Sequence, residues 1–384
     1  MIRGVCVWSV LALSAVVWAQ PGQEPEIPRQ PAGEAWALAQ TSREVRARVE
    51  PVEVIAFGSC FKPDGGPLDI WASINEEEPD VFVFLGDNIY ADTEDIVLMR
   101  AAYQKCRAVS GVAQLFRESI VLGTWDDHDY GKNDAGREYP MRERAQQEFL
   151  DFIGEPENSE RRRTPGVYDA EMLGPEGRRV QVILLDTRYF RSELRTEDRR
   201  ALPGHGVRGS YVAQTDPDAT MLGEAQWTWL EAQLRKPADL RIIASSVQVV
   251  AEDHGFEKWA NMPAERTRLL RLIRETGAEN VVCITGDRHR AEISRLDVAR
   301  AEPGSAVDIG YPLYDVTSSA LNRSNGRWVN EINRHRVGSQ YLRNNFGTLT
   351  IDWDAGTLVM RIHEEDGFPA IRHEIRLDEI AREE

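Results

Sequence analysis

Cysteine is scarce in this chain, with 4 among 384 residues. One of them, Cys6, lies in an N-terminal segment that we expect to be removed, which leaves Cys60, Cys106 and Cys283. A chain of this length can bury a sizeable core without disulfide staples, and its length allows one large α/β domain or two or three smaller ones. An odd number of cysteines in an exported chain leaves at least one thiol without an intramolecular disulfide partner. That thiol therefore needs another role.

Long apolar runs are also missing, except at the N-terminus. Residues 1–19 contain Arg3, an apolar run over residues 5–17 and the ending Val17-Trp18-Ala19. This pattern is typical of a secretory signal peptide and is too short to span a bilayer. An uncleaved N-terminal membrane anchor is the alternative, but no later segment has spanning length. We therefore expect a secreted or periplasmic chain with no transmembrane segment in its mature form.

Positive charge is in deficit, because 46 Lys and Arg residues face 63 Asp and Glu residues, which gives a formal net charge of −17. No basic stripe is available to replace the counterions of a nucleic-acid backbone, so we expect no nucleic-acid-binding surface. An anionic substrate could still be bound if bound cations reverse the charge locally.

The periodicity of the chain predicts one arm and one folded body. Residues 20–51 are rich in Pro, Glu and Gln and should form a linker or N-terminal arm, and the folded body should cover residues 52–384. A helix at 68–75 between strands at 52–57 and 81–85 favours a parallel sheet. Further strands are predicted at 119–123, 179–185, 240–250, 280–285 and 312–318. Alternating apolar and polar residues near the C-terminus predict an antiparallel hairpin at 347–353 and 357–363, so the sheets should be mixed.

Polar residues follow four of these strands almost directly. The continuous apolar run at 81–85 stops at Gly86 and Asp87, and Cys60, Asp127 and Asp287 follow other strands in the same way. Open α/β sheets place their ligand sites at the carboxyl ends of strands. Each motif taken alone also fits an ordinary turn or a solvated acidic loop. Their repetition at separate strand ends favours a metal site.

The donor types divide into two groups. Cys60, Asp87 and Tyr90 offer a thiolate, a carboxylate and a phenolate, and a tyrosine with an ordinary pKa of about 10 ionises near neutrality only beside a strong Lewis acid, which favours ferric iron. Asp127 and Asp287 are hard oxygen donors suited to calcium, magnesium or manganese. Asp87 could bridge the two sites.

The motifs also carry a family resemblance. Together and in this order they resemble the PhoD-type alkaline phosphatases of the calcineurin-like metallophosphatase superfamily: Ser59-Cys60, Gly86-Asp87-Asn88-Ile89-Tyr90, Trp125-Asp126-Asp127-His128-Asp129 and Gly286-Asp287-Arg288-His289. The resemblance implies an α/β fold, a four-layer α/β/β/α sandwich of two mixed sheets. It also implies a ligand set, with Fe³⁺ held by Cys60, Asp87, Tyr90 and His289, and a second cation held by Asp127 and Asp287.

The second cation has calcium as its family precedent, with Mn²⁺, Zn²⁺ or Mg²⁺ as alternatives. His128 matches the family position that contacts the phosphoryl group or the leaving oxygen. The chain departs from the broader superfamily on the strand that carries Ser246 and Gln248, where the usual histidine ligand is missing. That departure leaves the ligand shell of the second cation incomplete.

The expected activity is hydrolysis of phosphate mono- or diesters by a metal-bound hydroxide that attacks phosphorus, with His128 donating a proton to the leaving alcohol. The alternative role of His128 is only to hydrogen-bond Asp127. A phosphodiesterase or phospholipase-type activity is the nearest alternative, and the irregular segment 192–219 should decide it. A secreted calcium-binding structural module is the alternative of another class, but it leaves Cys60 and Tyr90 without a purpose.

Two further sets of residues each allow two roles. Lys132, Arg288 and Arg290 are candidate phosphate contacts, but in a chain with 46 Lys and Arg residues the favoured role of each is a surface charge. Asp126, Asn133 and Asp134 either bind a further calcium or order their own loop. Hydroxyl side chains near the ligands are limited to Ser59 and Thr124, which disfavours a serine nucleophile.

Overall fold

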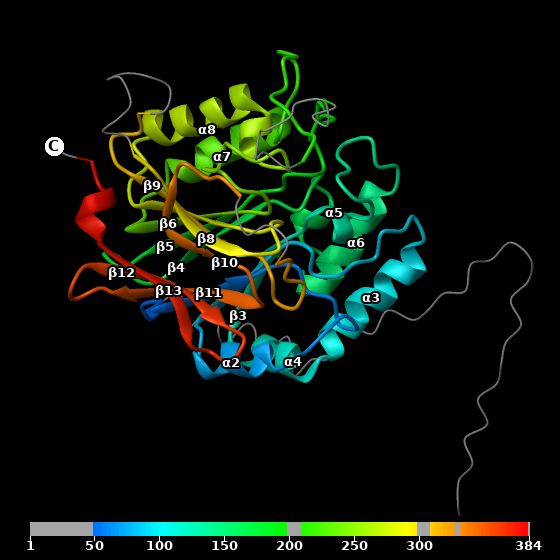
Figure 1. The fold of residues 1–384 in the computed structure, drawn as a ribbon, viewed down its shortest axis with the longest axis horizontal. Helices are drawn as coiled ribbons and strands as arrows, with labels where there is room; N and C mark the ends of the chain where they lie inside the picture. Colours follow the sequence, from blue (N-terminus) through cyan, green and yellow to red (C-terminus); the bar gives the residue numbers. More distant parts are fainter. Residues whose placement is uncertain (1–48, 198–208, 298–307, 327–330, 383–384) are drawn as a thin grey trace, which may run out of the picture.

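Two mixed β-sheets lie face to face between layers of helices in this computed structural model, which describes residues 49–197, 209–297, 308–326 and 331–382 (Figure 1). The first sheet has the strand order β13-β12-β11-β1-β2-β3, and the second has the order β10-β8-β9-β7-β6-β5-β4. Figure 1 shows α7 and α8 on the outer side of the second sheet and α2 and α4 on the outer side of the first. The predicted four-layer α/β/β/α sandwich is confirmed.

The strands have the following bounds. The first sheet contains β1 (Val54–Gly58), β2 (Val81–Leu85), β3 (Ile120–Thr124), β11 (Asn345–Asp352), β12 (Thr357–Glu364) and β13 (Pro369–Arg376). The second contains β4 (Asp169–Leu173), β5 (Val180–Leu184), β6 (Leu240–Ser245), β7 (Val281–Thr285), β8 (Ala291–Leu296), β9 (Leu313–Ser318) and β10 (Arg336–Tyr341).

The main helices are α2 (Ile70–Glu76), α3 (Ile96–Ala108), α4 (Ser110–Glu118), α5 (Asp127–Tyr130), α6 (Arg142–Ile153), α7 (Gly223–Leu234) and α8 (Pro263–Glu275). None of the helices in the described ranges combines the length and the apolar character needed to cross a membrane. The predicted signal peptide, residues 1–19, and all but residues 49–51 of the predicted arm lie outside the described residues.

Strand β2 is buried on both faces, as its continuous apolar run predicts. Val81, Val83 and Leu85 belong to the core cluster that joins the two sheets, whereas Phe82 and Phe84 belong to the cluster under the helices of the first sheet. This division follows the two-residue period of a strand, because successive side chains point to opposite faces. The strand therefore packs into both cores, and its carboxyl end leads directly into the loop that carries Asp87.

Parallel pairing brings the strand ends together. Strands β1, β2 and β3 are parallel neighbours, as are β5, β6, β7 and β9. The two sheets touch at these ends, where the Thr124 hydroxyl donates to the Leu185 carbonyl at 2.8 Å and the Ser59 hydroxyl donates to the Ser318 carbonyl at 3.3 Å. The loops that follow these strands in both sheets therefore lie next to one another.

The predicted strand at 240–250 is too long. Strand β6 ends at Ser245, and the Ser245 hydroxyl then donates to the Val247 carbonyl in a tight turn. The backbone amides of Val249 and Val250 donate to the buried carboxylate of Asp315, at 2.8 and 2.9 Å. Because a side chain distant in sequence satisfies these amides, the apolar pattern continues while the sheet does not.

We expect Gly347→Ala to lower the free energy of unfolding by about 1–3 kcal/mol, because overpacking strains a well-packed core. Gly347 on β11 lies opposite the fully buried Phe57 on β1, and an added β-carbon would lie 2.3 Å from Phe57 Cζ. Denaturant unfolding of the purified variant measures the change. Gly326→Ala is the matched control, because an added β-carbon there meets nothing within 4 Å. Equal unfolding midpoints for the two variants would contradict this account.

Candidate metal centre

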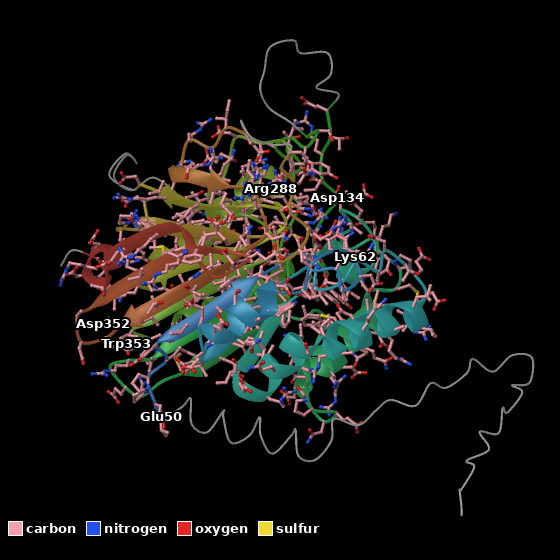
Figure 2. All side chains as sticks on the ribbon, turned by 60° about the horizontal axis from the view of Figure 1, so that its bottom comes forward. Glu50, Lys62, Asp134, Arg288, Asp352 and Trp353 are labelled. Atoms are coloured by element: carbon pink, nitrogen blue, oxygen red, sulfur yellow. The ribbon has the colours of Figure 1, made fainter. Side chains whose placement is uncertain are left out.

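The side chains predicted as ligands lie at adjoining strand ends. Cys60 comes two residues after β1, Asp87 two residues after β2, and Asp287 two residues after β7, while Asp127 opens α5 just after β3. Side chains at this end of the molecule include the labelled Arg288 and Asp134, whereas Asp352 and Trp353 lie at the other end of the sheets (Figure 2). This is the edge at which open α/β sheets place their ligands.

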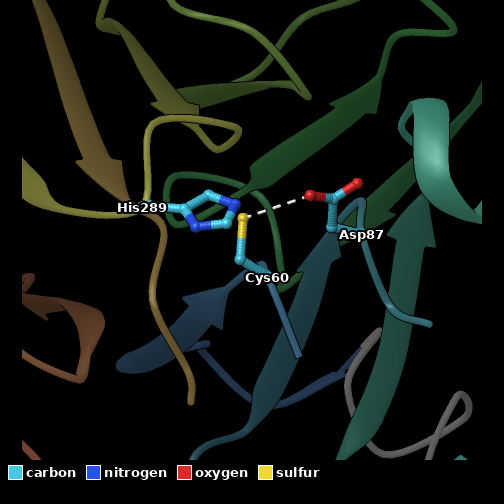
Figure 3. Close-up of side chains that lie close together, drawn as sticks. All are labelled: Cys60, Asp87 and His289. Atoms are coloured by element: carbon cyan, nitrogen blue, oxygen red, sulfur yellow. Dashed lines mark hydrogen bonds between the residues drawn. The ribbon is translucent and has the colours of Figure 1, made fainter. Parts of the chain in front are cut away.

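Four of the predicted residues form one compact cluster. The Cys60 Sγ lies 3.3 Å from Asp87 Oδ2, and the Tyr90 hydroxyl lies 2.9 Å from Asp87 Oδ2 and 3.1 Å from His289 Nε2. Ligand atoms of Cys60, Asp87 and His289 all lie within 4.8 Å of one another, and Figure 3 shows these side chains pointing toward a common region. The structure therefore brings together the residues predicted to bind iron.

Asp87 also belongs to a second group. Ligand atoms of Asp87, Asp127 and His128 lie within 4.8 Å of one another, so Asp87 stands between the two predicted sites. Asp287 is in neither of these three-residue groups. Burial is the main cause of the raised pKa of both Asp287 and the Cys60 thiol, but the charge of Asp127 also raises the pKa of Asp287, and the charge of Asp287 raises that of Cys60. Asp287 therefore borders both groups without joining either.

The backbone at these positions is strained. Cys60, Asp87, Asp287 and His289 have φ angles of 58°, 50°, 66° and 53°. Positive φ is uncommon for residues other than glycine, and such conformations persist where the surroundings impose them, often at functional sites. Neighbouring loops impose them here, because the Phe61 amide donates to the Asp87 carbonyl at 2.8 Å and the Cys60 amide to the Gly86 carbonyl at 3.4 Å.

The cluster concentrates acidic groups away from water. Burial raises the pKa of the Cys60 thiol to about 11, and burial followed by the charges of Cys60 and Asp127 raises the pKa of Asp87 well above its usual range. Burial also lowers the pKa of His289 to about 4, so its ring is neutral and able to act as a ligand.

These donors fit bound cations. Asp87 Oδ1 is buried and has no hydrogen-bond partner. Asp287 Oδ2 is also buried without a hydrogen bond, although Arg288 Nη1 lies 3.6 Å from it. A buried carboxylate oxygen without a partner is unfavourable unless a positive charge compensates it. A thiol, a phenol, an imidazole and several carboxylates together offer soft and hard donors, which suit a transition metal beside a hard divalent cation.

Asp129 and Ser319 hold the loops that carry these donors. The Asp129 carboxylate accepts the backbone amides of Asp87 and Asn88, each at 3.2 Å. The Ser319 hydroxyl lies 3.2 Å from Cys60 Sγ and accepts the amide of His289 at 2.9 Å. Sequence reasoning did not select either residue, although Asp129 lies in a recognised motif and Ser319 directly follows β9.

His128 lies beside the cluster with a partner that sequence reasoning missed. Its Nδ1 is 2.7 Å from Asp92 Oδ1, and its ring centroid is 4.3 Å from that of Tyr90. Burial alone would lower the pKa of His128, but the hydrogen bond to Asp92 and the charges of Asp87 and Asp127 raise it to about 10. The only hydrogen bond between His128 and the Asp127 side chain in the described structure comes from the His128 backbone amide.

Asp126, which directly precedes Asp127, has a counter-charge within the protein. Asp126 accepts from Arg188 Nε at 2.7 Å and from the Ser246 hydroxyl at 2.6 Å. Arg188 also donates to Glu257 at 2.6 and 2.9 Å. Asp127, Asp134 and Glu257 form a third group with ligand atoms within 4.8 Å, but Arg188 and Arg191 already supply cations to Glu257.

Loop ordering is therefore the role that the contacts favour for Asp126. The Asp134 carboxylate accepts a hydrogen bond from the Tyr211 hydroxyl. The Asp134 amide donates to Asp127 Oδ2 at 2.7 Å, and Asn133 is exposed. Sequence reasoning missed Glu257 and Arg188, although Arg188 follows strand β5 in the same way as the other motifs follow their strands.

Gln248, at the position of the missing histidine, faces another network. Its side-chain amide donates to Glu292 at 2.9 Å and to Thr317 at 2.8 Å, and its carbonyl oxygen lies 2.9 Å from His254 Nε2. The candidate phosphate contacts Arg288 and Arg290 both have an acidic partner within the protein, because both pair with Glu331. Arg288 also borders the centre, with Nη1 3.6 Å from Asp287 Oδ2. Arg290 is fully buried, and Lys132 is exposed.

Comparisons with known proteins agree with this arrangement. Residues 55–362 match the PhoD-like phosphatase family. Alkaline phosphatase D of Bacillus subtilis (strain 168) is 22% identical over 294 residues, which are 67% of this chain and 49% of that protein. The chain thus spans about half the length of the curated relative that it matches.

Two solved structures share the fold. A structure described as that of PhoD has a TM-score of 0.66 and 18% identity, covering 87% of this chain and 72% of that one. Purple acid phosphatase PPD1 from yellow lupin (Lupinus luteus) seeds has a TM-score of 0.57 and 12% identity, covering 85% of this chain and 54% of that one. The predicted metallophosphatase fold is confirmed, and because the family match extends over most of its length, the chain belongs to the PhoD-like phosphatase family.

Proposed function

We propose that this chain is a secreted or periplasmic metal-dependent phosphatase that hydrolyses phosphate esters, with residues 52–384 as its catalytic domain and residues 1–19 as a signal peptide. The convergence of Cys60, Tyr90 and His289 on the Asp87 carboxylate carries the proposal. A module that only bound calcium would have no use for a thiol and a phenol at this place, because calcium takes oxygen ligands such as carboxylates and carbonyls.

Cys60, Asp87, Tyr90 and His289 would hold Fe³⁺, and Asp127 and Asp287 would hold a second cation, for which we propose Ca²⁺. Asp87 would serve both, since it belongs to both three-residue groups. When bound, such cations supply Lewis acidity, which lowers the pKa of water and offsets charge on phosphoryl oxygens.

His128 would act as the catalytic acid or hydrogen-bond donor toward the leaving alcohol. The contact between Nδ1 and Asp92 fixes the ring and leaves Nε2 available for substrate. The side chain is 20% exposed, so a substrate can reach it. Asp92 acts through His128 and is therefore a positioning residue.

We expect His128→Ala to lower kcat by ~10²–10⁴-fold, the usual contribution of a general acid, while metal content stays unchanged. Steady-state kinetics with a nitrophenyl phosphate monoester and with a bis(nitrophenyl) diester measure the effect. His335→Ala is the control, because that histidine pairs with Glu252 and belongs to none of the three ligand groups. Full activity of His128→Ala would remove this residue from the mechanism. A preference of the wild-type protein for the diester would instead favour the phosphodiesterase alternative.

Tyr90→Phe should abolish the visible charge-transfer band that a ferric phenolate gives, and Cys60→Ala should weaken iron binding by at least ~10-fold, since even partners of metal ligands contribute that much. Elemental analysis and absorption spectroscopy of the purified proteins measure both. Cys106→Ala is the control for loss of a buried thiol, because Cys106 lies on α3. Iron content and spectrum that are the same in all three variants would refute the ligand assignment.

A further inference from the structure

Arg323 is a cation at the candidate metal centre that pairs with no carboxylate among the described residues. It lies in the loop after β9, is partly buried, and places its guanidinium carbon 4.8 Å from the centroid of the Tyr90 ring. Its Nε is buried and has no hydrogen-bond partner, and no ion pair within the described part of the chain includes its guanidinium. By contrast, Arg288 and Arg290 nearby both pair with Glu331.

The backbone that carries Arg323 is fixed to the two loops that carry Cys60 and His289. The Leu321 amide donates to the Ser59 carbonyl at 3.0 Å, and the Asn325 amide donates to the His289 carbonyl at 3.0 Å. The Asn322 side chain both donates to and accepts from the Lys62 backbone, at 2.7 and 2.8 Å. The backbone of Arg323 is therefore held in a fixed position relative to the loops that carry Cys60 and His289.

Arg323 reaches the cluster through Tyr90, one of the residues proposed to hold iron. The described residues show no hydrogen bond between Arg323 and the carboxylates of Asp87 or Asp287. Stacking on Tyr90 orients the guanidinium while leaving its N–H donors unused, because a cation–π contact engages the face of the guanidinium.

We propose that Arg323 is a substrate-binding residue whose guanidinium donates hydrogen bonds to non-bridging oxygens of the phosphoryl group. A guanidinium presents its donors as a planar fork that matches two phosphate oxygens. The inference rests on the proposed function in placing the phosphoryl group at this centre. It extends equally to inorganic phosphate, the product, which carries the same oxygens.

Calorimetric titration of inorganic phosphate into purified wild-type protein and variants, each with its metal content measured, tests the proposal. Arg323→Ala should raise the Kd for phosphate ~10- to 100-fold, the effect of losing hydrogen bonds to a charged group. Arg323→Lys should recover only part of the loss, because an ammonium group cannot form the bidentate contact. KM for a nitrophenyl phosphate monoester should rise in parallel.

Arg268→Ala is the matched control. The Arg268 guanidinium also stacks on an aromatic ring, 4.7 Å from the centroid of Trp227, but it pairs with Glu224. This variant should bind phosphate as the wild type does.

The possible outcomes are distinct. Unchanged phosphate affinity in Arg323→Ala would overturn the proposal, as would a wild-type protein that binds no phosphate. Loss of metal from Arg323→Ala, with phosphate binding lost in proportion, would show instead that Arg323 only supports Tyr90. Phosphate binding that depends on Arg323 in a protein that hydrolyses neither nitrophenyl ester would refute the proposed function and leave the role of Arg323 standing.

Discussion

Mutual repulsion among buried acidic groups is the constraint under which this end of the molecule is built. Cys60 and Tyr90 both lie within hydrogen-bonding distance of Asp87, and Asp127 and Asp287 border them. Burial first, and neighbouring charges after it, raise the pKa values of Cys60 and Asp87, so these two groups hold their protons unless a positive charge compensates them. The surrounding fold keeps these groups in place against that repulsion.

Backbone hydrogen bonds between loops hold these acidic groups in place. Parallel strands of both sheets end at one edge, and amides of one loop donate to carbonyls of the next, as Phe61 does to Asp87. Asp129 and Ser319 add side-chain acceptors for the amides of the strained residues. Because a site of this kind needs its donors placed to within a fraction of an ångström, rigid strand ends are better supports than long loops.

The sequence predicts the donors better than it predicts their neighbours. The apolar run that ends at Asp87 reveals both the strand and its polar terminus, and the same pattern locates Cys60, Asp127 and Asp287. Asp92, Glu257 and Arg323 have no such local signal, since tertiary contacts between distant segments bring them to the site. A tertiary contact also explains why β6 ends earlier than predicted. The Asp315 carboxylate accepts the amides of Val249 and Val250, and this contact cannot be recognised from the local sequence.

The two adjacent aspartates of the loop after β3 share one counter-charge within the protein. Asp126 is neutralised by Arg188, an internal counterion that the polypeptide carries with it. Asp127, its immediate neighbour, lies 3.9 Å from the same guanidinium and also faces the cluster shared with Asp87. Although burial raises the pKa of Asp127, the charge of Arg188 helps to lower it to about 2. The loop can thus reach its native shape from the chain's own charges, so that assembly of the polypeptide and capture of its ions are separable events. The proposed phosphatase would then fold first and become active only when its surroundings supply the metal.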